Sequence, residues 1–142
     1  MSQPPSHITR EHFLEWRSPC RGTTNPHEMT NDVWAWLIET RLDANEAFDG
    51  PSSIDAGPGW CFDRFGQSET LLPDGRTVLV AGEHEDFYDS DFFIYNDVVV
   101  VEKTGEISIF GYPVDVFPPT DFHSATLVHS GFLVRKKMGI MK

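Results

Sequence analysis

The amino-acid sequence predicts an α+β fold, with two N-terminal helices followed by an antiparallel β-sheet. Three observations lead to this fold class. Apolar residues recur at helical spacing in the first half, and short β-type runs separated by tight-turn signals fill the second half. A six-residue run in the middle of the chain also returns near its end, as expected for a repeated structural unit.

The first predicted helix is short and begins after Thr9. Threonine is a good N-cap residue, because its hydroxyl accepts a hydrogen bond from an otherwise unsatisfied backbone N–H of the first turn. Ile8 can pack against Phe13 across this cap as a hydrophobic staple. Pro19 favours an end to the helix before it.

The second predicted helix runs from Thr30 or Asn31 to Ala47, after a loop over residues 20–28. Asp32 suits the positive end of the helix dipole. One apolar stripe at helical period marks the buried face, at Trp34, Leu37, Ile38 and Leu42. Gly-Pro segments at 50–51 and 57–59 then break the pattern.

Four strands are predicted in the second half, over residues 68–72, 77–81, 97–101 and 106–110. The turn signals Pro-Asp-Gly at 73–75 and Lys-Thr-Gly at 103–105 separate them into two hairpins. Four consecutive valines at 98–101 are typical of a strand that is buried on both faces.

The repeat relates QSETLL at residues 67–72 to HSATLV at residues 123–128, each followed by a glycine three residues later. The unit from Thr70 to Val128 resembles a kelch repeat, the blade of a kelch-type β-propeller. The pieces that carry this resemblance are PDGRTVLVAG, YNDV, the glycine of the second turn, and the restart FHSATLV. Ala81 and Gly82 stand where the family has two glycines.

The resemblance implies a helical region over residues 1–58 and a kelch-like β region over residues 59–142, together forming a single compact unit. It covers about one blade and the start of a second, whereas propellers close with about four to eight blades. We therefore expect the chain to be incomplete, truncated within a second blade, or part of an oligomer.

Composition indicates a folded, acidic protein. Hydrophobic residues make up 39% of the chain, and 22 acidic against 11 basic residues leave a formal charge of −11. This charge repels phosphate backbones and anionic lipid, so nucleic-acid and membrane partners are not expected. With no leader-like or membrane-spanning segment in the sequence, we predict a cytoplasmic protein. A disulfide between Cys20 and Cys61 is not required, because such a protein stays reduced.

The candidate binding residues lie in an acidic segment over residues 83–93, which holds five carboxylates, one histidine and no lysine or arginine. Aromatic residues between acids suit recognition of a basic partner or a sugar, and the pattern favours the alternative that these aromatic residues pack onto the sheet. A cation site is a second interpretation, although the spacing matches no calcium or zinc motif. The residues predicted to bind are Glu83, His84, Glu85, Asp86, Tyr88, Asp89, Asp91 and Phe93.

Two further groups of reactive residues favour structural roles. His123 and Ser124 are neighbours in a strand, so their side chains point to opposite faces and do not form a dyad. Cys61 would need a nearby histidine to act as a nucleophile, and the sequence places none there. We therefore expect Cys61 to be buried among aromatic residues, with Asp63 and Arg64 paired beside it.

The resemblance favours non-catalytic binding as the function, because kelch-like folds are commonly interaction platforms. No catalytic residue, metal ligand or cofactor is predicted, a protein partner is expected, and oligomers are compatible with the pattern. The alternatives are a fragment of a kelch-like enzyme or metal-binding protein, or a truncated product without independent activity.

Overall fold

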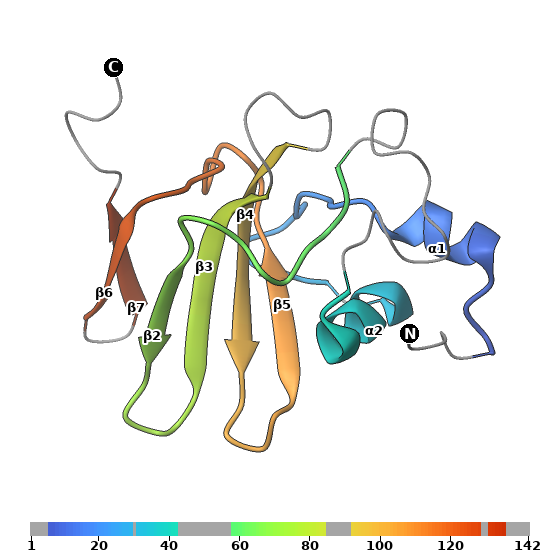
Figure 1. Cartoon of the computed structure of the whole chain (residues 1–142). Coiled ribbons are helices and arrows are strands. Elements are labelled where there is room, and N and C mark those ends of the chain that lie inside the picture. Colours follow the sequence, from blue (N-terminus) through green and yellow to red (C-terminus); the bar gives the residue numbers. More distant parts are fainter. Residues whose placement is uncertain (1–5, 30, 43–57, 85–91, 129–130, 136–142) are drawn as a thin grey trace. The chain divides into compact units, whose positions relative to one another are not determined.

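The computed structural model describes residues 6–29, 31–42, 58–84, 92–128 and 131–135, the last of these as backbone only. The described chain contains two helices and seven strands, which confirms the α+β class (Figure 1). Neither described helix has the length and apolar character of a membrane span. The elements in chain order are α1 (Arg10–Trp16), β1 (His27–Glu28), α2 (Asp32–Thr40), β2 (Ser68–Leu71), β3 (Thr77–His84), β4 (Phe93–Val101), β5 (Ile107–Gly111), β6 (Ser124–Val128) and β7 (Gly131–Arg135).

These elements group into two compact units, each built from separate stretches of chain. Unit 1 comprises Met1–Cys20, Thr30–Arg64 and His84–Phe93, and unit 2 comprises Arg21–Met29, Phe65–Glu83 and Ile94–Lys142. Both helices therefore belong to unit 1, and nearly all of the strand residues belong to unit 2. The division predicted from the sequence, at residue 58, separates helical from β-type sequence and stays a prediction.

Helix α1 begins as predicted. The Thr9 hydroxyl accepts a hydrogen bond from the backbone N–H of His12, at 3.1 Å. Ile8 and Phe13 are both buried, and Phe13 meets Trp36 of α2 edge to face, with 6.2 Å between ring centroids. Helix α1 therefore uses its buried phenylalanine to pack against α2.

Helix α2 begins after Asn31 as predicted, but its end differs from the prediction. Asn31 caps the helix by accepting a hydrogen bond from the backbone N–H of Trp34, at 2.7 Å. The helix stops at Thr40 instead of Ala47, because Arg41 adopts the left-handed conformation with φ 61° and bonds back to the Leu37 carbonyl. Leu42 therefore lies beyond the helix, and residues 43–47 lie outside the described residues.

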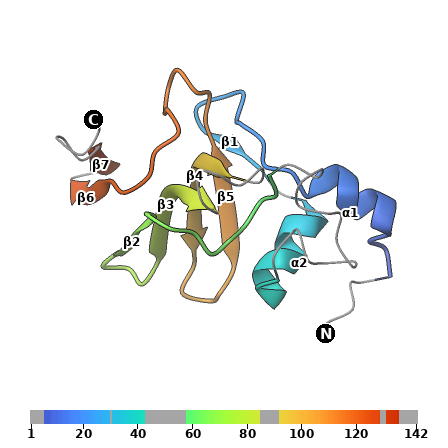
Figure 2. The ribbon, with the colours of Figure 1, turned by 45° about the horizontal axis from the view of Figure 1, so that its top comes forward.

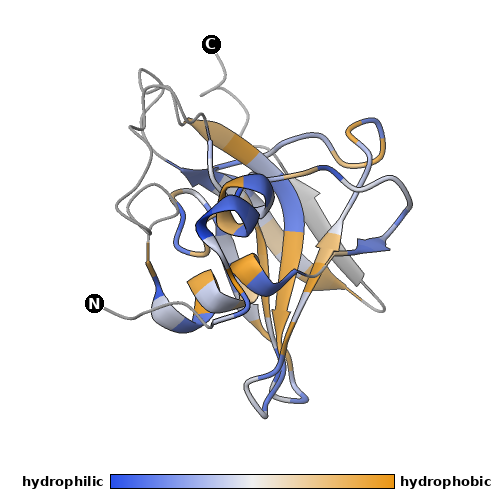
Figure 3. Ribbon diagram, turned by 90° about the vertical axis from the view of Figure 1, so that its right-hand side faces the viewer, coloured by the Kyte–Doolittle hydropathy of each residue, from blue (hydrophilic) through white to orange (hydrophobic). Residues whose placement is uncertain are grey.

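The sheet of unit 2 has five antiparallel strands in the order β1-β5-β4-β3-β2, so β2 to β5 are neighbours in chain order (Figure 1). The four strands predicted from the sequence are confirmed within a few residues, although β3 and β4 extend further toward each other. Both predicted turns form, with Gly75 at φ 98° and Gly105 at φ 95°. Figure 3 shows apolar colour along the strands and polar colour at the hairpin turns.

Strand β1 corrects the prediction of a continuous loop over residues 20–28. His27 and Glu28 pair with Gly111 and Phe110 of β5 and so extend the sheet by one short strand (Figure 2). A strand of two residues is too short to show the alternation of apolar and polar residues by which strands are predicted from sequence. The strand exists because the open edge of β5 offers unpaired backbone groups.

The valine run in β4 is less buried than predicted. Val99 is fully buried, whereas Val98 and Val100, which point to the other face, are half-buried. These two pack against the apolar cluster of Leu72, Val78, Val80 and Ala81. Val101, on the same face as Val99, is also half-buried, so the prediction of full burial is correct for Val99 alone.

The two copies of the sequence repeat both form strands, but in two different sheets: β2 is an edge strand of the five-stranded sheet, and β6 pairs with β7 in a separate two-stranded sheet. Leu71 lies in β2 and Leu127 in β6, and each strand is the first of an antiparallel hairpin. Strand β6 also lies near β2, where His123 Nε2 is 3.0 Å from the Ser68 hydroxyl oxygen. As expected, His123 forms no dyad with Ser124, because its ring turns to the other copy of the repeat.

We predict that His123 makes the stability of the protein depend on pH. Burial lowers the pKa of His123 below its ordinary value of 6.5, and the nearby Asp121 carboxylate opposes this only in part. Because the unfolded chain then binds the proton more readily, this contribution to stability is complete above about pH 6.5 and is lost as the pH falls below it.

Urea unfolding at about pH 7.5 and pH 5.5 checks this prediction, since the two values lie on either side of the ordinary histidine pKa. The free energy of unfolding should fall less between them in the variant His123→Gln than in the wild-type protein. Identical falls in both proteins would show that His123 does not contribute.

Candidate functional site

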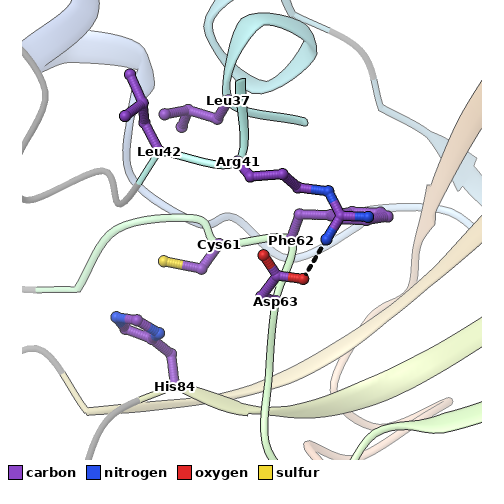
Figure 4. Close-up of a pocket in the computed structure, with 7 residues that line it drawn as sticks. All are labelled: Leu37, Arg41, Leu42, Cys61, Phe62, Asp63 and His84. Carbon is purple, nitrogen blue, oxygen red and sulfur yellow. Dashed lines mark hydrogen bonds and ion pairs between the residues drawn. The ribbon is translucent and has the colours of Figure 1, made fainter. Parts of the chain in front are cut away.

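The candidate site is a cavity of about 100 Å³ in unit 1 (Figure 4). Three separate segments supply its lining: the end of α2 with the residues that follow, the stretch before β2, and the last residue of β3. The lining residues are Leu37, Arg41, Leu42, Cys61, Phe62, Asp63 and His84.

The ion pair between Arg41 and Asp63 and the aromatic ring of Phe62 line this cavity side by side. The Arg41 guanidinium donates a hydrogen bond to Asp63 Oδ1, and its central carbon lies 4.5 Å from the centroid of the Phe62 ring. Both charged side chains are more than half exposed, at 58% and 66%. An exposed pair of this kind contributes about 0–1 kcal/mol to stability, so its main effect is on the chemistry of the cavity.

The left-handed conformation of Arg41 helps to place this pair. Continued helix would carry the Arg41 side chain along the α2 surface, whereas the C-cap turns the chain at this residue. The sequence gives no warning of this turn, because the residue is not the glycine or asparagine that usually occupies such a cap.

The stretch that carries Cys61 is held by its neighbours. Trp60 is fully buried, stacks on Trp34 with ring centroids 4.9 Å apart, and donates its backbone N–H to the Arg17 carbonyl at 2.7 Å. Arg64 Nε donates to the Cys61 carbonyl at 2.8 Å, and its guanidinium lies 5.3 Å from the Trp60 ring centroid. Cys61 is therefore anchored from both sides.

This arrangement corrects the expected pairing of Asp63 with Arg64. Asp63 instead pairs with Arg41, which comes from a segment more than twenty residues earlier. The Arg64 Nε donates to the Cys61 carbonyl, and the Arg64 guanidinium lies near the Trp60 ring. Contacts made by tertiary folding have replaced the pairing of sequence neighbours.

Cys61 is buried as predicted, with 5% of its surface exposed, but the structure also supplies the histidine that the sequence could not place. His84 is 8% exposed and lines the same cavity. Figure 4 shows the Cys61 sulfur and the His84 ring on the same side of the cavity. A thiol and an imidazole in one cavity are the components of a nucleophile and its base.

Three of the predicted binding residues lie in the described part of the chain, and only His84 reaches the cavity. Glu83 is half-buried, and its backbone exchanges two hydrogen bonds with Phe65, each of 2.8 Å. Phe93 is half-buried at the start of β4. The remaining predicted residues, Glu85, Asp86, Tyr88, Asp89 and Asp91, lie outside the described residues.

Sequence reasoning misses the contribution of α2 to this site, which is made by Leu37, Arg41 and Leu42. The helical period assigns Leu37 and Leu42 only to a buried stripe. No spacing rule connects these residues with Cys61 or His84, because the three segments meet only through the packing of unit 1.

Within the described ranges, no three side chains of the His, Cys, Asp and Glu types come together as a group able to hold a metal ion. Comparison of the chain with models of protein families, with curated proteins and with solved structures found no match.

Proposed function

We propose that this chain is a non-catalytic binding protein of the kelch-like type, and that its acidic segment over residues 83–93 recognises a basic protein partner. One observation carries this proposal. His84 is both the second residue of the acidic segment and a lining residue of the cavity. The acidic segment therefore contributes one residue, His84, to the cavity.

Charge favours a basic partner. The protein has a formal charge of −11, and residues 83–93 hold five carboxylates without a compensating lysine or arginine. A field of this sign attracts cationic partners and increases the rate at which they bind. The four aromatic residues of the segment supply the apolar contact area that charge alone lacks.

The cavity adds a place where a cationic side chain can bind. Arg41 already lies over the Phe62 ring and against the Asp63 carboxylate, so the protein itself shows how a guanidinium fits there. Because the Arg41–Asp63 pair is exposed, a lysine or arginine of the partner can compete for Asp63 and Phe62. A cavity of about 100 Å³ has the volume of about three water molecules and admits only the end of such a side chain.

Two features of unit 2 support the kelch-like part of the proposal. Strands β2 to β5 follow one another across the sheet in chain order, as in a propeller blade. At the positions where the family has paired glycines, Ala81 has φ 53° and Gly82 has φ 99°. These are conformations that glycine adopts most readily.

Neutralising the acidic segment is expected to weaken partner binding. The test variant combines Glu85→Gln, Asp86→Asn and Asp89→Asn, and the probe is a panel of fluorescent lysine- and arginine-rich peptides followed by anisotropy. We expect at least about a tenfold rise in Kd, and an affinity of the wild-type protein that falls as salt screens the charges.

The matched control removes three carboxylates from exposed positions elsewhere, by Glu15→Gln, Glu69→Gln and Glu106→Gln. It changes the net charge equally, so any general electrostatic effect appears in both variants. The proposal is wrong if the two triple variants bind the peptides with the same affinity, or if no basic peptide binds the wild-type protein.

A further inference from the structure

The cavity that contains Cys61 and His84 has a chemistry that partner binding does not use. The thiol belongs to an anchored stretch of chain and the imidazole to the end of β3, yet both line the same space (Figure 4). Each is more than nine-tenths buried. A buried thiol is normally inert, but one that borders a cavity beside an imidazole has both a route for a small reagent and a proton acceptor.

We propose that Cys61 is a modification site, at which its thiol forms a mixed disulfide with small, uncharged disulfides that enter the cavity. This inference shares its cavity and His84 with the proposed partner site, but it rests on the reactivity of the Cys61 thiol, which partner binding does not use, so failure of peptide binding and failure of thiol modification are distinguishable.

The exchange is balanced without any further reactant. The imidazole of His84 accepts the proton of the Cys61 thiol, and the sulfur then attacks one sulfur of the incoming disulfide. A new bond forms between Cys61 Sγ and that sulfur while the original S–S bond breaks. The departing sulfur takes both electrons of the broken bond and receives the proton from His84, so the disulfide is the oxidant and half of it leaves as a thiol.

The lining of the cavity selects the reagent. Leu37, Leu42 and Phe62 provide apolar walls, and the charges of Arg41 and Asp63 compensate each other. An uncharged reagent leaves the Arg41–Asp63 pair intact, whereas a cationic side chain has to displace Arg41, and the volume of about 100 Å³ limits the size of the group that enters. Only one half of a disulfide has to enter the cavity for its sulfur to reach Cys61. One hydroxyethylthio group of the disulfide of mercaptoethanol is small and uncharged, whereas each half of glutathione disulfide is a charged tripeptide.

The second cysteine of the chain gives an internal reference. Cys20 is exposed and Cys61 is buried, so accessibility alone predicts that Cys20 reacts first with every disulfide. The variants Cys20→Ser and Cys61→Ser each retain one thiol. Their mixed-disulfide formation is followed by acid quenching and intact-mass spectrometry, first with the disulfide of mercaptoethanol and then with glutathione disulfide.

We expect the Cys20→Ser protein to be modified by the small disulfide in the absence of denaturant, and at least tenfold less readily by glutathione disulfide. Cys20 in the Cys61→Ser protein should discriminate much less between the two reagents. Adding His84→Gln should slow the modification of Cys61 at least tenfold, in keeping with the contribution of a positioned base, and leave the Cys20 rate unchanged.

A second measurement keeps the test decisive if His84→Gln perturbs folding. In the Cys20→Ser protein with His84 intact, the rate at Cys61 should be insensitive to low urea concentrations, because the native cavity admits the reagent. A rate that rises in parallel with the fraction of unfolded protein would overturn the proposal, as would equal rates with both reagents or no effect of His84→Gln in a folded variant.

Discussion

The substitution Trp60→Ala is expected to lower the free energy of unfolding by about 3–5 kcal/mol, the range for truncation of a large buried aromatic side chain. Trp60 is fully buried, and its ring stacks on that of Trp34 with an angle of 11° between the ring planes. The favourable stacking adds about 0.5–1.5 kcal/mol to the area that both rings bury. Arg64 also loses the ring over which it lies.

Urea unfolding followed by circular dichroism measures this loss, and Trp16→Ala is the matched control. Trp16 is the same residue type in unit 1, but 44% of its surface is exposed. Its removal should cost less than about 1 kcal/mol, as is usual for surface positions. Similar losses for the two variants would mean that the stacked pair does not stabilise unit 1.

The substitution Asn96→Ala in β4 is expected to lower the free energy of unfolding by about 3–4 kcal/mol. Each of the three hydrogen bonds of the Asn96 side chain contributes about 1 kcal/mol, and the substitution leaves all three partner groups without this bond. Asn96 is 1% exposed. Its Nδ2 donates to the carbonyls of Tyr112 and Phe117, at 2.9 and 2.8 Å, and its Oδ1 accepts from Arg21 at 3.0 Å. This one side chain joins three segments of unit 2.

Thermal or urea unfolding of Asn96→Ala and Asn96→Leu separates the hydrogen bonds from the volume that the side chain fills. Leucine restores most of that volume without the polar groups, so both variants should be strongly destabilised. Asn31→Ala is the control of the same residue type, because Asn31 makes one capping bond and should cost about 1 kcal/mol. A mild effect of Asn96→Leu would contradict the account based on hydrogen bonds.

The helix starts and the hairpins can be predicted because local chemistry decides them. Thr9 and Asn31 satisfy backbone donors that lie within the next three residues, and the turns around Gly75 and Gly105 require a positive φ that glycine supplies. The self-repeat also marks two strands that each begin a hairpin. All of these depend on residues that are near each other in the chain.

The site can be predicted only in small part. His84 is a candidate for its place in an acidic segment, and Cys61 draws attention for its reactivity, but nothing in the sequence connects them. Arg41 is hidden within a predicted helix, because its left-handed cap conformation carries no glycine or asparagine signal. Pairing of Asp63 with Arg41 requires α2 to end where it does.

By itself, the sequence determined the helix caps, the alternation of strands and turns, and the acidic character of residues 83–93. Those properties arise from interactions over a few residues or from composition. Only the tertiary structure decided that Cys61 and His84 share a cavity, that β1 completes the sheet edge, and that Asn96 joins distant carbonyls. The physical reason is that burial and backbone pairing bring together residues that are far apart in the chain. A local sequence pattern contains no information about which distant residues will meet.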